Sequence, residues 1–122
     1  MKRDLDLIRS ILLRIEEADT YQRNLTNESF YDLCDDENLL SLHLELLSEA
    51  GYIEITDVMY IGIIKDFMIR RLTVNGYDYL DSVRSDGVWT NTKKRLTDIG
   101  GSASFELVKE LAIHTTKGLL GL

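Results

Sequence analysis

The chain has 122 residues, 44% of them hydrophobic, with one cysteine and no proline. This length supports one domain with its own core, and the apolar content excludes a largely disordered chain. A formal net charge of −7 argues against a protein that binds nucleic acid over most of its surface, although a local basic patch can oppose the total.

The ends and the cysteine content predict a cytoplasmic protein. Cys34 is the single cysteine, so no disulfide forms within the chain, and we expect a partly buried residue rather than a nucleophile. Asp4 and Asp6 interrupt the basic N-terminus, unlike a signal peptide. The longest apolar run, residues 58–64, is far below the roughly 20 residues of a membrane helix, so no membrane partner is expected.

The first predicted element is a helix over residues 4–18. Its apolar residues recur at three- and four-residue steps, namely Leu5, Ile8, Leu12 and Ile15. Further along, residues 27–34 fit either a short strand or one helical turn.

A second helix is predicted over residues 36–50, with Asp35 as its N-cap and Gly51 ending it. From position 35 to 49 the segment carries no lysine or arginine and five acidic residues: Asp35, Asp36, Glu37, Glu45 and Glu49. His43 lies among leucines on this helix. We expect it at the edge of the core, hydrogen-bonded to a neighbour, rather than acting as a metal ligand.

A β-hairpin is predicted next. Residues 52–56 alternate between apolar and polar, and residues 67–72 form the second strand, with Phe67, Ile69 and Arg71 on one face. The segment 57–66 connects the strands, and Gly62 and the Lys65–Asp66 pair are the turn candidates.

Three helices complete the chain. The first follows Thr73 as its N-cap, and the second spans about residues 87–98. The last is capped by Ser102 or Ser104 and carries the apolar stripe Phe105, Val108, Leu111 and Ala112. The apolar tail 118–122 either frays or docks on a partner.

This order predicts an α+β fold: a winged-helix-like domain with a two-stranded hairpin wing and a C-terminal helical extension. Residues 1–85 form the predicted core, and residues 86–122 form an extension packed on the same domain, so that the chain is one domain overall. In a helix-turn-helix, a supporting helix comes just before the recognition helix. Here only residues 27–33 could form it, which weakens the case for DNA docking.

Four blocks resemble a known family: "MKRDLDLIRSILLRIEE" (1–17), "HLELLSEAGYIE" (43–54), "RLTVNGYDYLDSVRSDGVW" (71–89) and "TKKRL" (92–96). They are similar to domain-of-unknown-function family twenty-five thirteen, small proteins of bacteria and their phages. The resemblance implies a winged-helix-like fold and a phage or mobile-element origin, and it implies no catalytic residues.

No catalytic, cofactor or metal motif is present. His43 and His114 are far apart in the sequence, and no HExxH or CxxC pattern occurs. The glycines form no phosphate-binding loop, and the Gly100–Gly101 pair is more typical of a turn between helices. The sequence therefore predicts a protein without enzymatic activity, cofactor or small-molecule substrate.

Two sets of residues are candidate contact sites. Apolar side chains on or near the wing indicate a protein interface: Tyr52, Met59, Tyr60, Ile61, Ile63 and Ile64. The alternative is that the last helix covers them. Basic residues could instead hold DNA phosphates: Lys65, Arg70, Arg71, Lys93 and Lys94. The simpler reading of these is a solvated basic face.

The leading hypothesis is a regulatory or interaction protein, of phage or mobile-element type, that acts through contact with another protein or with itself. The acidic helix would steer a basic partner. The contending hypothesis is a DNA-binding transcriptional regulator. A weaker one is an acidic inhibitor that mimics nucleic acid.

Overall fold

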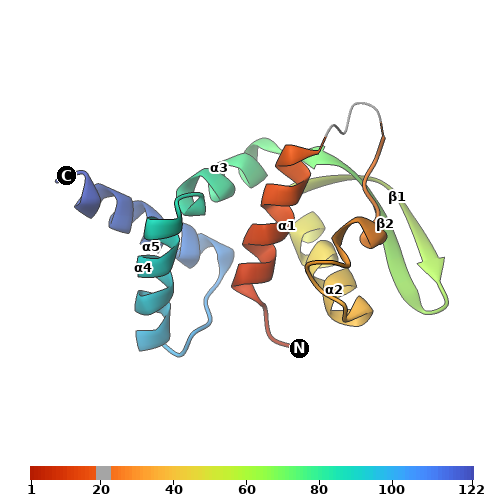
Figure 1. Ribbon diagram of the computed structural model, residues 1–122, viewed down its shortest axis with the longest axis horizontal. Helices are drawn as coiled ribbons and strands as arrows, with labels where there is room; N and C mark the ends of the chain where they lie inside the picture. Colours follow the sequence, from red (N-terminus) through yellow and green to blue (C-terminus); the bar gives the residue numbers. More distant parts are fainter. Residues whose placement is uncertain (19–22) are drawn as a thin grey trace. The chain divides into compact units, whose positions relative to one another are not determined.

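The computed structural model describes residues 1–18 and 23–122, a mixed α+β chain (Figure 1). Its elements, in chain order, are helix α1 (Leu5–Glu17), the short 3₁₀ helix η1 (Asn27–Phe30), helix α2 (Glu37–Glu49), strands β1 (Ile53–Ile61) and β2 (Ile64–Leu72), and helices α3 (Val74–Val83), α4 (Asp86–Asp98) and α5 (Phe105–Leu119). The chain divides within α3 into two compact units, unit 1 (Met1–Tyr77) and unit 2 (Asp78–Leu122).

Unit 1 consists of two helices, η1 and the antiparallel β1–β2 hairpin. Helix α1 packs on β2, and α2 contacts both strands. The core is built from the apolar stripes of these elements, and its fully buried members include Ile8, Ile11, Leu12, Phe30, Leu40, Leu44, Leu47, Ile69 and Leu72. At roughly 1.5–3 kcal/mol for each large apolar side chain, burial of this set is the main stabilising contribution to unit 1.

Both predicted helices of unit 1 are confirmed, with one correction at a cap. Asp4 caps α1 through a hydrogen bond from the Leu7 N–H to its carboxylate, 3.0 Å. At α2 the N-cap is Asp36, not Asp35: its backbone is extended and its carboxylate accepts the Leu39 N–H at 3.1 Å. Asp35 and Asp36 can both act as an N-cap, so the sequence does not show which of them begins the helix.

The hairpin is longer than the sequence indicated. Pairing continues to Ile61 and Ile64, so only Gly62 and Ile63 form the turn, and Lys65–Asp66 lies within β2. Gly62 has φ +65 at the first central position, as in a type II′ turn, whose twist suits a two-residue hairpin. The turn at Gly62 is therefore confirmed, and the turn at Lys65–Asp66 is wrong.

Irregular pairing changes which residues of β2 face the core. The register shifts twice, between Glu54 and Ile55 and between Ile55 and Asp57. An extra residue in one strand reverses the direction of every side chain beyond it. As a result Leu72 is buried together with Phe67 and Ile69, whereas Arg71 is exposed, contrary to the predicted alternation.

The outer edge of β2 is closed by polar contacts from the segment before η1. Leu25 exchanges two backbone hydrogen bonds with Ile69, of 2.9 and 2.8 Å. The buried Asn27 side chain then accepts the Phe67 N–H at 3.0 Å and donates to the Lys65 carbonyl at 2.8 Å. Residues 27–34, for which a strand and a helical turn were both open, thus begin with a 3₁₀ turn that holds β2 through a side chain.

The outer edge of β1 has a different arrangement. Phe67 pairs with Val58 across the hairpin, but its N–H donates to the Asn27 side chain on the other side of β2. Phe67 and Val58 are therefore a pair without mutual hydrogen bonds, and the Val58 N–H faces away from β2. The Asp57 carboxylate accepts this N–H at 2.9 Å.

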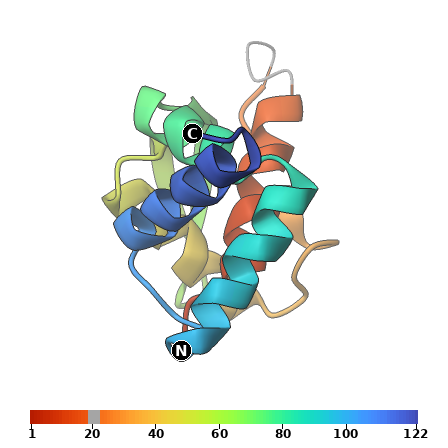
Figure 2. The ribbon, with the colours of Figure 1, turned by 90° about the vertical axis from the view of Figure 1, so that its left-hand side faces the viewer.

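Unit 2 is helical. Ser85 caps α4 and Ser104 caps α5, each accepting the N–H three residues on. Helices α4 and α5 pack side by side (Figure 2). The buried residues of unit 2 include Tyr79, Leu80, Val83, Val88, Trp89, Leu96, Phe105, Val108 and Ala112. The predicted stripe of the last helix is confirmed except at Leu111, which is partly exposed.

Candidate functional site

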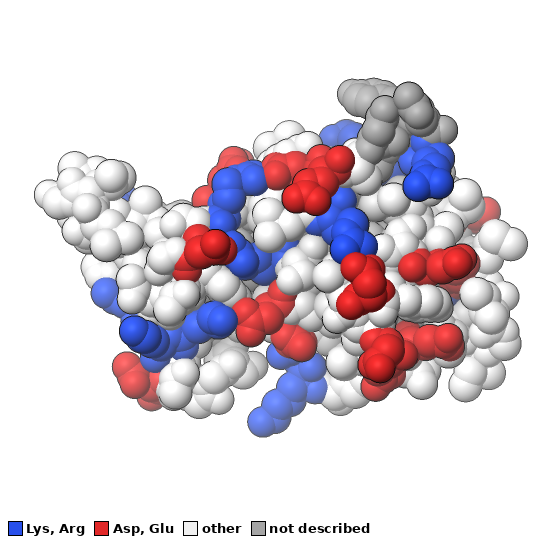
Figure 3. All heavy atoms as spheres, viewed as in Figure 1, with Lys and Arg blue, Asp and Glu red and all other residues white. Residues whose placement is uncertain are grey.

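The end of the hairpin carries the most prominent group of exposed apolar side chains in unit 1. Ile63, in the turn, is 94% exposed, and the strand residues beside it are also exposed: Val58, Met59, Tyr60 and Ile61. We call these five residues the hairpin tip. Figure 3 shows an uncharged surface at this end of the molecule, with acidic side chains beside it. A large apolar side chain that is almost fully exposed is typical of a contact surface.

Two of the predicted interface residues lie outside the hairpin tip. Tyr52 is 9% exposed, because it begins the hairpin next to the core, and its carbonyl accepts the Thr73 N–H at 3.0 Å. Ile64 is partly exposed. The predicted patch is therefore restricted to the far end of the hairpin.

The predicted basic residues of unit 1 are paired with carboxylates. Lys65 donates to Glu45 on α2 at 2.7 Å, and this hydrogen bond raises the pKa of the lysine. Arg70 and Arg71 both approach Glu54, at 3.4 and 2.9 Å. These three cations are thus partly neutralised where a phosphate would have to bind.

A further pair in unit 1 joins α1 to the turn after η1. Arg14 forms two hydrogen bonds with the Asp32 carboxylate, 2.9 and 2.7 Å long, and also donates to the Ser29 carbonyl. The hydrogen bond from Arg14 lowers the pKa of Asp32 and raises the pKa of Arg14. This contact has a structural role and is not part of a site.

The acidic side chains of α2 differ in their availability. Asp35, Asp36, Glu37 and Glu49 are exposed, whereas Glu45 is half-buried and paired with Lys65. The expected negative surface on this helix is therefore real, and most of it faces solvent.

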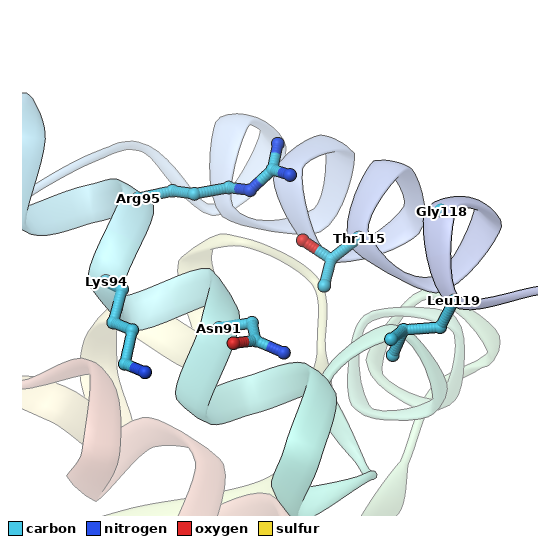
Figure 4. A pocket seen from close by; sticks show the side chains of 6 residues that line it. All are labelled: Asn91, Lys94, Arg95, Thr115, Gly118 and Leu119. Carbon is cyan, nitrogen blue, oxygen red and sulfur yellow. The ribbon is translucent and has the colours of Figure 1, made fainter.

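The cations of unit 2 are arranged differently. Lys93 lies 5.8 Å from the centre of the Trp89 ring, as in a cation–π contact. Lys94 and Arg95 are exposed and line a hollow of about 320 Å³ between α4 and α5, together with Asn91, Thr115, Gly118 and Leu119 (Figure 4). The sequence prediction proposed Lys93 and Lys94, and not Arg95, as phosphate contacts, although residues 91, 94 and 95 share one side of a helix.

His43 is a buried structural residue. Its side chain is fully buried, the Nδ1 atom lies 2.7 Å from the Leu39 carbonyl, and the Nε2 atom accepts the Asp4 N–H at 2.7 Å. The expected hydrogen bond to a neighbour is confirmed, but the side chain lies within the core rather than at its edge. It connects the start of α1 with α2.

Other chemistry is limited in the described part of the chain. Cys34 is half-buried and its thiol lies 3.5 Å from the Asp36 carbonyl. In residues 1–18 and 23–122, no group of three or more His, Cys, Asp or Glu side chains is placed to hold a metal ion. Within the same residues, no helix is both long and apolar enough to span a bilayer.

Sequence comparison places the chain in a family. The family described as "Hypothetical protein (DUF2513)" matches residues 2–103. The chain belongs to the DUF2513 family. A relative from Haemophilus influenzae, described as "Uncharacterized protein", is 34% identical over 112 residues, which cover 92% of each chain. No solved structure matches this DUF2513 protein.

The family match includes the whole hairpin tip but only one wall of the hollow between α4 and α5. It covers the whole hairpin and α4 but ends before α5, which supplies the second wall of the hollow. The hairpin tip therefore lies on the part of the chain that the family match includes.

Proposed function

We propose that this DUF2513 protein is a non-catalytic binding module whose hairpin tip docks into an apolar recess of a partner protein. The observation that carries the proposal is the exposure of the hairpin tip, with Ile63 94% exposed at the turn. Side chains of this size contribute roughly 1.5–3 kcal/mol each when they are buried, and a few such residues dominate a protein interface.

The order of elements in unit 1 supports a winged-helix-like reading. The sequence of α1, a bridging residue, η1, α2 and the β1–β2 hairpin is the order of a winged helix, in which Leu25 takes the place of the first short strand. The supporting helix is reduced to the four residues of η1, Asn27–Phe30. In this reading α2 is the recognition helix and β1–β2 is the wing.

The charges of α2 favour a basic partner. Its exposed acidic residues and the acidic Asp57 on β1 would be repelled by phosphates and attracted by lysine and arginine side chains. We therefore propose a protein partner with an apolar recess bordered by basic residues. A phage or mobile-element regulatory role in the cytoplasm is consistent with such a module.

The proposal is tested by capture of partners with matched variants. The purified protein is immobilised, exposed to extract of the cell that naturally makes it, and compared with the Tyr60→Ser/Ile63→Ser variant. The native protein should capture a partner in stoichiometric amount, and the amount captured by the variant should be at least tenfold lower. Val74→Ser is the control, because Val74 is apolar and 73% exposed but lies on α3.

Two results would contradict the proposal. One is a protein that remains a strict monomer by light scattering and captures no stoichiometric partner. The other is an equal loss of the partner with Val74→Ser, which would indicate non-specific apolar adhesion.

A DNA-binding regulator is the competing proposal, and the winged-helix-like order is the observation in its favour. It requires duplex DNA to bind at about 50 mM salt, with an affinity that falls steeply as salt rises and weakens in Arg70→Ala/Arg71→Ala. The pairing of both arginines with Glu54 argues against it. An acidic nucleic-acid mimic would instead inhibit a nuclease without binding DNA itself.

A further inference from the structure

We infer that the hollow between α4 and α5 in unit 2 binds a doubly charged phosphoryl group. This site is separate from the hairpin tip and does not depend on the proposed protein contact. The inference rests on the side chains that surround the hollow, on their charge and on the absence of a carboxylate partner.

The donors of the hollow come from one side of α4. Positions 91, 94 and 95 are three and four residues apart, so their side chains lie on the same side of the helix. Figure 4 shows the Arg95 side chain reaching toward α5 and the Asn91 amide in the space between the helices, whereas the Lys94 side chain leaves α4 in another direction. Asn91, Lys94 and Arg95 all line the hollow, so one amide and two cationic side chains border it.

The two cations are available for a ligand. Among the residues that the structure describes, no carboxylate lies within ion-pair distance of Lys94 or Arg95, whereas Arg14, Lys65, Arg70 and Arg71 in unit 1 each have one. An anion that binds in the hollow is attracted by both cations.

The other wall of the hollow is neutral and accessible. The Thr115 hydroxyl donates to the Leu111 carbonyl at 2.8 Å, so the donors for an anion are those of α4. Gly118 has no side chain, and a Cβ at this position would meet nothing within 4 Å. A volume of about 320 Å³ leaves room for a phosphoryl group and part of the molecule that carries it.

The charge balance selects the class of anion. Two cations and one neutral amide match a phosphoryl group, which carries a charge of about −1.5 to −2 at neutral pH, better than a single carboxylate. The doubly charged phosphoryl group could belong to a free phosphorylated compound or to the terminal phosphate of a nucleic acid, and the test separates these sources.

The test uses inorganic pyrophosphate as the probe, added to the full-length protein in about 20 mM salt and followed by calorimetry and by amide NMR shifts. We expect a Kd of about 1 mM or tighter, with shifts centred on residues 91–95 and 115–119. Acetate, the single-carboxylate comparison, should bind at least tenfold more weakly.

Variants identify the hollow as the site. Lys94→Gln/Arg95→Gln should weaken pyrophosphate binding by about tenfold or more for each cation removed. Gly118→Met should weaken it as well, since it adds a side chain to the wall of the hollow without altering charge. Lys109→Gln, on α5 and outside the residues that line the hollow, is the charge control and should leave binding within about twofold.

A short DNA duplex with 5′-terminal phosphates distinguishes the sources. Binding of duplex that pyrophosphate displaces, and that is lost in Lys94→Gln/Arg95→Gln, assigns the phosphoryl group to nucleic acid. Pyrophosphate binding without duplex binding assigns it to a small compound. A Kd for pyrophosphate above about 10 mM, or an equal loss of affinity in Lys109→Gln, overturns the inference.

Discussion

Units 1 and 2 differ in whether their basic side chains are paired with carboxylates. Unit 1 contains fifteen acidic and eight basic residues, and unit 2 contains six of each, so the whole net charge of −7 belongs to unit 1. The cations that the hairpin of unit 1 provides are paired with Glu45 and Glu54, whereas Lys94 and Arg95 of unit 2 face an open hollow. Net charge therefore predicts poorly where an anion can bind, because the distribution of partners decides which cations are available.

The two units also differ in how tightly their glycines are packed, and one substitution made in both gives the largest expected effect. A Cβ at Gly76 in α3 would overlap the backbone oxygen of Tyr52, whereas a Cβ at Gly118 in α5 meets open space. Gly76→Ala should lower the free energy of unfolding by about 3 kcal/mol or more. Gly118→Ala should raise it by up to about 1 kcal/mol.

Urea denaturation followed by circular dichroism measures both changes. Trp89 is the single tryptophan, so its fluorescence reports unit 2 separately. Equal stability of Gly76→Ala and the native protein would contradict the close approach of α3 to Tyr52.

Buried polar side chains sharpen the same comparison. Asn27→Ala in unit 1 removes the amide that accepts the Phe67 N–H and donates to the Lys65 carbonyl. The free energy of unfolding should fall by about 2–3 kcal/mol. Thr92→Val in unit 2 removes a hydroxyl that donates to the Val88 carbonyl within α4, and should cost about 1 kcal/mol or less. Thermal or urea unfolding of the two variants gives the order, and an equal cost would show that Asn27 does not hold the β2 edge.

Removing the paired carboxylate should make unit 1 resemble unit 2. Glu54→Gln leaves Arg70 and Arg71 without their common partner, so retention on a phosphate or heparin column should increase, with apparent affinity rising about two- to tenfold. Glu17→Gln, an exposed change of equal charge on α1, should have a smaller effect. Equal retention of the two variants would mean that only the net charge matters.

The smallest expected effect concerns acid stability. Arg14 lowers the pKa of Asp32, so this pair stabilises the folded state fully above the ordinary pKa of an aspartate, and the contribution is lost as the pH falls through the lowered value. Asp32→Asn should therefore lose less stability between pH 7 and pH 3 than the native protein. Both groups are partly exposed, so the difference in urea midpoint should be small. An identical loss in both proteins would assign the acid sensitivity to other groups.

Helices were the part of the fold that the sequence predicted best. Apolar residues at three- and four-residue steps defined α1 and α2 to within a residue or two, and Ser104 was one of the two caps predicted for α5. These signals are local, so they need no knowledge of the tertiary fold.

The outer half of the hairpin was missed for the opposite reason. From Val58 to Ile64 almost every residue is apolar, so the alternation that identifies a strand is absent. Pairing with the other strand defines this segment, and that information is non-local. The role of Asn27 was also invisible, because its amide holds backbone atoms about forty positions away.

The candidate surfaces were predicted in outline only. Met59, Tyr60, Ile61 and Ile63 of the predicted apolar set are exposed, whereas Ile64 is partly exposed and Tyr52 is buried. The pairing of Arg70 and Arg71 with Glu54 depends on the register of the hairpin. Arg95 required knowledge that α5 lies beside α4.

The hydrogen bond from the Val58 N–H to the Asp57 carboxylate has a consequence for solubility. Residues 58–64 have the composition of amyloid-forming segments: apolar, uncharged and without proline. Asp57 acts as a gatekeeper, since its carboxylate accepts an edge N–H that another β-strand could use and places a negative charge beside it. Asp57→Val would be expected to form fibrils at concentrations where the native protein stays dissolved.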